Sequence, residues 1–166
     1  KIQNPNFDLA ARKFQYRFEL YGNGGKLIYT ARGESFLYAG EIRHLTEVVE
    51  ASFLEAEETK LFLESPEWVK TENFKRPLLA LQEVRITKEN EIVRADGRLV
   101  NQDAGRLPRV ELIAVIYGYL GQPVGVSRSE IHDMAPGEGR AFSIIHPDLP
   151  SLVPTKTEIS AFALRP

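Results

Sequence analysis

Apolar and polar side chains alternate from Phe14 to Leu20, with Phe14, Tyr16, Phe18 and Leu20 on one side and Gln15, Arg17 and Glu19 on the other. A period of two residues is typical of a strand in an antiparallel sheet with one buried face. A glycine-rich stretch, Gly22 to Gly25, follows, and a second apolar run ends at Tyr29. Because glycine adopts the backbone conformations of tight turns, this stretch predicts a β-hairpin.

The second half of the chain contains a segment of the same parity, with Val110, Leu112, Ala114 and Ile116 on one side. Its other side carries Ile113, Val115 and Tyr117, so we expect this strand to be covered on both faces. Left uncovered, Ile113 and Val115 would form a small apolar patch for a contact between domains or subunits. We expect the facing sheet to bury them instead. Gly118 and Gly121 predict a second hairpin turn.

Further runs in this half have the length and composition of strands, namely 78–87, 91–101, 122–131, 139–146 and 155–164. Gly, Pro and Asn separate them, which is the pattern of an antiparallel β-sandwich. A helix competes only from Glu41 to Glu64, where Ala and Glu are frequent and the apolar residues do not settle the period. The predicted fold class is therefore all-β.

The two halves resemble each other at a nearly constant offset of about 97 residues. The matching positions are Asn4 and Asn101, Tyr21 and Tyr117, Gly25 and Gly121, Ile28 and Val124, Gly40-Glu41 and Gly137-Glu138, and Leu45 and Phe142. This period is too long for a solenoid repeat, so it predicts two tandem domains, residues 1–74 and 75–166. The repeated hairpin then belongs to the architecture and not to an active site.

The alignment of the halves also predicts that the first domain lacks its N-terminal strand or strands. Residues 2–4 correspond to residues 99–101, the last residues of a strand, whereas the second half has about 20 residues of strand before that point. We expect the missing strand to lie upstream or to come from another chain by edge pairing. The chain opens on Lys1 rather than Met, which we interpret as a fragment or processed form.

Composition excludes several classes of function. Of the 166 residues, 43% are apolar, enough for one sizeable core or two small ones. The 21 basic and 23 acidic residues give a net charge of −2, which argues against nucleic acid as a partner. Cys is absent, which excludes disulfides, thiolate nucleophiles and cysteine-based metal sites. No apolar run reaches the roughly 18 to 20 residues that span a bilayer.

The three histidines, His44, His132 and His146, have no spacing typical of a metal site, which needs three or four converging ligands. We interpret them as surface histidines. Ser143, His146 and Asp148 have the residue types of a hydrolase triad. However, Ser143 lies within a predicted strand and lacks the glycine-flanked turn that presents a nucleophile. The sequence predicts no catalytic, cofactor-binding or metal-binding residue, and no cofactor.

An acidic stretch runs through the later part of the first predicted domain, with Glu47, Glu50, Glu55, Glu57, Glu58, Glu64 and Glu67 against one base, Lys60. Calcium at a domain junction is an open alternative, although the alternating aspartates of a calcium loop are absent. We expect a solvated face. The glycines at Gly22 to Gly25 lack the spacing and the following helix of a phosphate-binding loop, so a hairpin turn explains them.

Trp68 precedes the expected linker between the domains, Lys70 to Pro77. An exposed Trp would suit a partner interface, where Trp is enriched among the residues that contribute most to binding. We expect instead that Trp68 packs in a core or at the junction between the domains.

Several short motifs resemble known families. Asn4-Pro5-Asn6-Phe7, the stretch from Phe18 to Tyr29, Gly33 and Ala39-Gly40-Glu41 resemble the water-stress and hypersensitive-response domain of LEA14-like proteins. The same hairpin, and residues 115–125 followed by Ala135-Pro136-Gly137-Glu138, are similar to the FxLYD domain of bacterial surface proteins. Two positions depart from these patterns, Asn101-Gln102-Asp103 in place of Asn-Pro-Asn, and Gly22 in place of an acidic residue after Tyr21.

Both resemblances imply an immunoglobulin-like or fibronectin-like β-sandwich and no enzymatic activity. The tandem arrangement is also similar to that of uncharacterised membrane-anchored proteins of candidate-phylum bacteria, which implies a membrane helix before residue 1 and domains that face outward. We therefore expect a non-catalytic, extracytoplasmic structural, adhesion or assembly module that binds a protein partner or itself. The alternative is a soluble, cytoplasmic, LEA14-like domain that protects against stress or binds a ligand.

Overall fold

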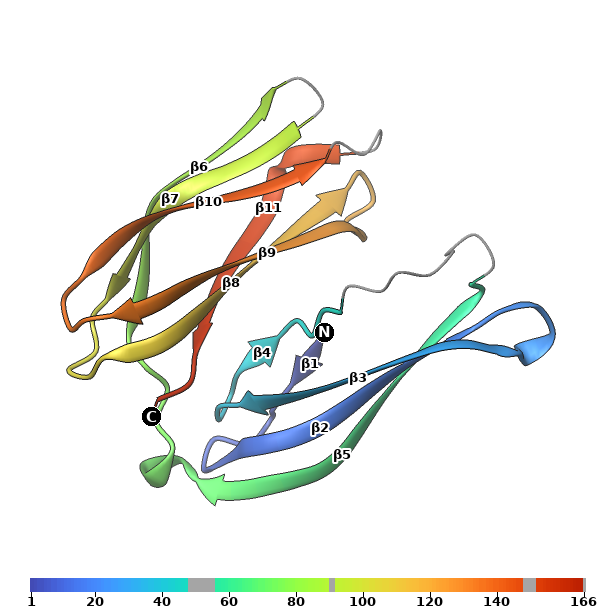
Figure 1. Ribbon diagram of the computed structural model, residues 1–166, viewed down its shortest axis with the longest axis horizontal. Helices are drawn as coiled ribbons and strands as arrows, with labels where there is room; N and C mark the ends of the chain where they lie inside the picture. Colours follow the sequence, from blue (N-terminus) through green and yellow to red (C-terminus); the bar gives the residue numbers. More distant parts are fainter. Residues whose placement is uncertain (48–55, 90–91, 148–151, 166) are drawn as a thin grey trace. The chain divides into compact units, whose positions relative to one another are not determined.

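The computed structural model describes residues 1–47, 56–89, 92–147 and 152–165. Its contacts divide the chain into two compact units, Lys1–Lys75 (unit 1) and Arg76–Pro166 (unit 2). Both units consist of antiparallel sheets (Figure 1), so the predicted all-β class is confirmed.

Unit 2 is a β-sandwich of two three-stranded antiparallel sheets (Figure 1). Its strands are β6 (Leu79–Glu89), β7 (Ile92–Asn101), β8 (Leu107–Gly118), β9 (Pro123–Met134), β10 (Gly139–Pro147) and β11 (Leu152–Ala163). One sheet has the order β10-β7-β6 and the other has the order β11-β8-β9. Leu99 of β7, Leu112 of β8 and Phe142 of β10 are buried in one cluster between the sheets. The strands expected in this half are confirmed.

The central strand β8 is buried on both faces, as expected from its sequence. Val110 and Leu112 belong to the core between the sheets, whereas Ile113 and Val115 pack with Phe162 on the other face of β8. Alternation along a strand makes these two sets point in opposite directions. The expectation that the facing sheet buries Ile113 and Val115 is therefore wrong, because that sheet lies on the side of Leu112.

Unit 1 contains one full sheet and one short one. Its strands are β1 (Ile2–Gln3), β2 (Leu9–Tyr21), β3 (Leu27–Leu37), β4 (Ile42–Arg43) and β5 (Glu58–Lys70). The three-stranded sheet has the order β3-β2-β5, and β1 pairs with β4 alone. A first cluster buries Phe14, Tyr16 and Leu37, with Leu45 packed against it. In a second cluster Tyr38 stacks on Phe74 at 4.6 Å between ring centroids.

The register of the strands repeats between the units. Ile2 lies opposite Arg43 in unit 1, and Leu99 lies opposite Arg140 in unit 2, which are the same positions at the predicted offset. The hairpin turns also coincide. The Gly22 amide donates to the Lys26 carbonyl at 2.9 Å, and the Gly118 amide donates to the Gln122 carbonyl at 2.8 Å. The predicted duplication is therefore visible in equivalent hydrogen bonds.

Unit 1 lacks the N-terminal strands of unit 2, as the sequence predicted. Its described residues contain no counterpart of β6, and the two-residue β1 stands where unit 2 has the ten-residue β7. The region from Glu41 to Glu64, where a helix competed with strands, contains β4 and the first half of β5. The rest of that region, residues 48–55, lies outside the described residues.

Candidate functional site

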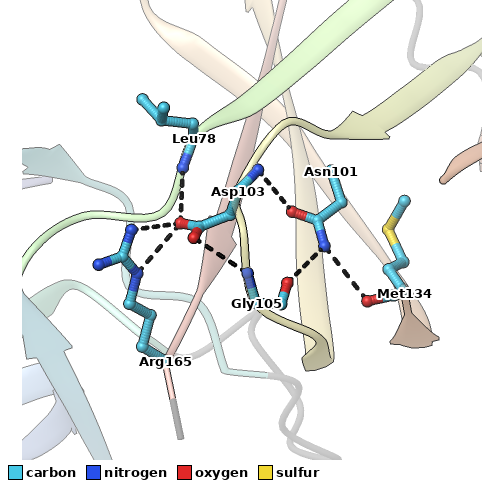
Figure 2. Close-up of polar contacts among 6 residues, drawn as sticks. All are labelled: Leu78, Asn101, Asp103, Gly105, Met134 and Arg165. Carbon is cyan, nitrogen blue, oxygen red and sulfur yellow. Dashed lines mark hydrogen bonds and ion pairs between the residues drawn. The ribbon is translucent and has the colours of Figure 1, made fainter. Parts of the chain in front are cut away.

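The most extensive polar cluster of unit 2 centres on Asn101, a fully buried residue at the end of β7 (Figure 2). Its Nδ2 donates to the carbonyl oxygens of Gly105 at 2.9 Å, Met134 at 3.2 Å and Ala135 at 3.1 Å. Its Oδ1 accepts from the Asp103 amide at 3.0 Å. A buried amide needs such partners, and here they join the end of β7 to two loops.

Asp103 extends this cluster to the C-terminal end of the chain (Figure 2). Its carboxylate accepts from the Leu78 amide at 3.2 Å, the Gly105 amide at 3.4 Å and Nε of Arg165 at 3.0 Å, and it also contacts Nη2 of Arg165. Burial raises the pKa of Asp103, but the bonds from Arg165 and the two amides outweigh burial, so the pKa lies below its usual value. Asp103 is thus charged and fully used in folding.

Unit 1 builds the equivalent cluster around Asn4. Its Nδ2 donates to the carbonyls of Leu9 at 2.8 Å and Tyr38 at 3.1 Å. Its Oδ1 accepts from the amide and the Nδ2 of Asn6 at 3.1 and 3.0 Å. The Asn-Pro-Asn motif is therefore a structural element, in which one buried asparagine replaces backbone pairing where the chain leaves a strand.

The Ala-Gly-Glu and Ala-Pro-Gly-Glu segments complete both clusters. A carboxylate oxygen of Glu41 accepts from the Tyr38 amide at 2.8 Å, and one of Glu138 accepts from the Ala135 amide at 2.7 Å. Gly137 has a φ of 73°, which the turn requires and which glycine adopts without strain. A 2.6 Å bond from Arg140 lowers the pKa of Glu138, so this carboxylate also stays charged. These motifs hold turns in place.

The histidine interpretation needs a correction at His146. This half-buried side chain on β10 contacts Oγ of Ser127 on β9 through Nδ1 at 2.8 Å, and burial lowers its pKa. It is therefore not an ordinary surface histidine. Ser143, the residue suggested by the sequence, is exposed and three positions away on the same strand, so it points to the opposite face. Asp148 lies outside the described residues.

The Ser127–His146 pair has only part of the geometry of a catalytic dyad. Nε2 of His146 is buried without a hydrogen-bond partner, and an added Cβ on Gly125 would lie 2.5 Å from it. A working dyad needs a second group that orients the histidine, together with space for a substrate next to the serine. The pair instead links two strands of different sheets. No sequence signal identified Ser127, because its position opposite His146 depends on how β9 meets β10.

The other two histidines have different surroundings within their own units. His132 is exposed on β9, with Nε2 3.4 Å from Glu130, and His44 is half-buried just after β4. Within the described ranges, no three His, Asp or Glu side chains converge as a metal site would require.

Of the acidic residues that the structure describes, Glu58, Glu64 and Glu67 are spread along the edge strand β5. Glu58 pairs with Lys60 at 3.3 Å, Glu64 with Arg17 at 2.9 Å and Glu67 with Arg12 at 3.9 Å. Glu47 accepts from the Tyr16 hydroxyl at 2.5 Å, and Glu57 precedes β5. Glu50 and Glu55 lie outside the described residues. Exposed ion pairs of this kind are typical of a solvated surface.

Trp68 lies on β5 and is 48% exposed, so it is not the core residue of unit 1 that the sequence suggested. Its expected place at a junction with the second domain stays a prediction.

Among the residues of unit 2 that the structure describes, the most exposed large apolar side chains are at the tip of the hairpin between β8 and β9. Tyr119 and Leu120 are 84% and 90% exposed. The equivalent turn of unit 1 has Asn23 and Gly24 at these positions, with matching backbone hydrogen bonds. The two turns share these closing hydrogen bonds but differ at the tip, because Gly24 has a φ of 70° and Leu120 has no positive φ. Closure of the hairpin therefore does not require an aromatic and an aliphatic side chain at this tip.

No family model matches this chain, and no curated protein matches it in sequence. Among the described residues, no helix is long and apolar enough to cross a membrane.

Proposed function

We propose that this protein is a non-catalytic structural or assembly module that binds a protein partner through the tip of the β8–β9 hairpin. The observation that carries this proposal is the difference between two equivalent turns. Tyr119 and Leu120 stand in unit 2 at the positions of Asn23 and Gly24 in unit 1, where the hairpin is closed by the same backbone hydrogen bonds. The support lies in the pairing, because two adjacent, almost fully exposed apolar side chains stand at a tip whose hairpin closes without them.

The chemistry of the tip suits a protein interface. Tyrosine is enriched among the residues that contribute most to binding, because it offers a large apolar surface and a hydroxyl at low entropic cost. The polar clusters around Asn4 and Asn101 offer no competing site, since their side chains are bonded within the fold. A rigid sandwich that presents a hairpin tip is a common way of displaying a binding surface.

The resemblance to FxLYD domains favours an immunoglobulin-like module that faces the outside of the cell, anchored by a segment preceding residue 1. The LEA14-like alternative is a soluble, ligand-binding or stress-protective domain. These two functions require different binding surfaces. A ligand-binding domain needs an enclosed pocket, whereas a surface module binds its partner through exposed loops.

Photo-crosslinking tests the proposal. The chain carries a benzophenone amino acid at position 119 in one variant and at the equivalent position 23 in a matched control, and both are expressed in the native cells. We expect a discrete crosslinked protein from position 119 and none from position 23. Equal crosslinking patterns from the two positions, or none from either, would contradict the proposed binding tip.

A second variant separates binding from folding. Tyr119→Asn with Leu120→Gly gives the tip of unit 2 the residues of unit 1. Because these side chains are almost fully exposed, we expect the free energy of unfolding to fall by no more than about 1 kcal/mol, mainly through the added freedom of glycine in the unfolded chain. Purification with the identified crosslinked protein should fail for this variant. Retained binding by the variant would contradict the assignment of the tip as the binding surface.

A further inference from the structure

The β1-β4 sheet of unit 1 and the β10-β7-β6 sheet of unit 2 differ in extent although they share a register. In unit 2 the ladder of β7 and β10 continues to Ile92 opposite Pro147, and β6 pairs with the other edge of β7. In unit 1 the ladder consists of Ile2 with Arg43 and Gln3 with Ile42, and no strand in the described part of the chain pairs with the outer edge of β1. The β1-β4 sheet of unit 1 thus corresponds to one end of the β7-β10 ladder of unit 2.

The inner face of the three-stranded sheet of unit 1 is also partly open. Tyr29 on β3 lies opposite the buried Leu20, and Leu63 on β5 lies opposite the buried Tyr16, so both share that face. Yet Tyr29 is 37% exposed and Leu63 is 52% exposed. Tyr29 pairs near the hairpin end of β2 and Leu63 pairs near its middle, whereas β1 contributes only Ile2 to the apolar cluster on this face.

Unit 2 shows what covers the equivalent region. Ile86 of β6 and Val93 of β7 pack with Ile116, which corresponds to Leu20 of unit 1. Both contacts come from the strands that unit 1 lacks, which links the missing strands to the exposed face.

We propose that an extended β-hairpin directly N-terminal to Lys1 completes unit 1. Its second strand continues β1 alongside residues 45–47, and its first strand pairs with the outer edge of β1. Its inward residues are apolar at alternate positions, as Val93, Ala95 and Leu99 are in β7, and they cover Tyr29 and Leu63.

Continuity with the existing ladder favours this occupant. Ile2 and Gln3 already hold the positions of Leu99 and Val100, so the preceding residues continue β1 without a change of register. Leu45 packs on the cluster of Phe14 and Tyr16, as Phe142 packs in the core of unit 2. The segment after β4 therefore already follows the path of β10.

The geometry of unit 1 disfavours strand addition at β5. Pro66 cannot donate a ladder hydrogen bond, and Ser65 has a φ of 50°, so the strand is irregular there. Such features are common on edge strands, where they prevent pairing with another chain. The short sheet is thus the more favourable place for an additional hairpin.

A graft tests the proposal within the full chain. Residues 76–97 are repeated directly before Lys1, which supplies β6 and the remainder of β7 in register because Lys1 corresponds to Arg98. A control graft carries Val93→Asp and Ala95→Asp in the added segment, which places carboxylates on its inward face. A third graft carries Val93→Ala, which relieves crowding against the aromatic side chains of unit 1.

Two readouts report on the predicted contacts. One is amide hydrogen exchange at Gln3 and Leu45, which correspond to Val100 and Phe142 of unit 2. By the register of unit 2, the amide of Val100 faces β6 and that of Phe142 faces β7, so these two amides should pair with the added hairpin. The other is thiol labelling of a Leu63→Cys variant. The parent chain has no cysteine, so the introduced side chain is the only thiol. We expect exchange and labelling to slow by about 10-fold or more in the apolar grafts relative to the control graft and the ungrafted chain, because stable pairing raises the free energy of local opening.

Equal rates in the apolar grafts, the control graft and the ungrafted chain would overturn the proposal. Protection by the same hairpin added as a separate peptide, without protection in either apolar graft, would also overturn it, because the edge would then accept a strand only from another chain. Amide exchange of β8 should be the same in all forms, which shows that the effect is confined to unit 1.

Discussion

Replacing Asn101 with alanine removes the polar centre of unit 2 without changing its apolar core. The Nδ2 group has two hydrogens for three carbonyl acceptors, and Oδ1 accepts one amide, so about three full hydrogen bonds are lost. At about 1 kcal/mol each, the free energy of unfolding of unit 2 should fall by about 3 kcal/mol. This is a large fraction of the roughly 5–15 kcal/mol by which domains are stable.

The assay must distinguish the two units. Hydrogen exchange at the β8 amides reports on unit 2, and a loss of about 3 kcal/mol corresponds to exchange roughly 100-fold faster in the native state. Trp68 is the only tryptophan and belongs to unit 1, so its fluorescence in a urea titration reports on that unit. Its midpoint should stay unchanged in Asn101→Ala.

A matched control lies next in the chain. Gln102 is exposed, so Gln102→Ala should change the stability of unit 2 by less than about 0.5 kcal/mol. If Asn101→Ala costs no more than this control, the asparagine does not organise the loops and the structural assignment of the motif is wrong.

Three further predictions concern packing and pH. Gly97→Ala should lower the melting temperature of unit 2, because the added Cβ would lie 2.7 Å from Cζ of Phe142, at a cost of about 1–3 kcal/mol. Gly105→Ala is the control for thermal melting, since a Cβ at that position has no atom within 4 Å. Burial lowers the pKa of His146, so its stabilising contribution is present above the ordinary value of 6.5 and is lost as the pH falls toward the folded pKa. Urea titrations at pH 7.5 and 5.5 should show that the free energy of unfolding falls for the parent chain and for His132→Gln, and falls less for His146→Gln. An equal fall in all three proteins would contradict this prediction. The pKa of Asp103 lies below 3.8, so Asp103→Asn should destabilise unit 2 at neutral pH, and its difference from the parent, followed by near-ultraviolet circular dichroism, should shrink as the pH falls through the folded pKa. A difference that is independent of pH would count against the Arg165 pair.

The sequence predicted the strands well because the signals are local. Alternation from Phe14 to Leu20 and from Val110 to Ile116 states which side of each strand is apolar, and this requires no knowledge of the rest of the chain. The turn glycines are equally local, since a positive φ favours glycine wherever it occurs. The equivalence of Asn4 with Asn101 and of Leu45 with Phe142 followed from comparing the chain with itself.

Candidate sites were harder to predict, because they depend on which strands become neighbours. Ser127 and His146 are on different sheets, and Ser143 was suggested in place of Ser127 only because it is close in sequence. The roles of Asn101 and Glu138 as loop supports required the positions of the carbonyls and amides that they bind. The exposure of Tyr119 and Leu120 is informative only beside the equivalent turn of unit 1.

The order of residues alone determined that the chain forms antiparallel strands, that it does so twice, and that the first copy has fewer strands than the second. The tertiary structure decided which face of β8 meets the second sheet, which polar side chains are consumed by loops, and which apolar ones stay exposed. The reason is physical. Strand formation and turns follow from side-chain period and backbone freedom over a few residues, whereas burial and hydrogen bonding depend on atoms that folding brings together from distant parts of the chain.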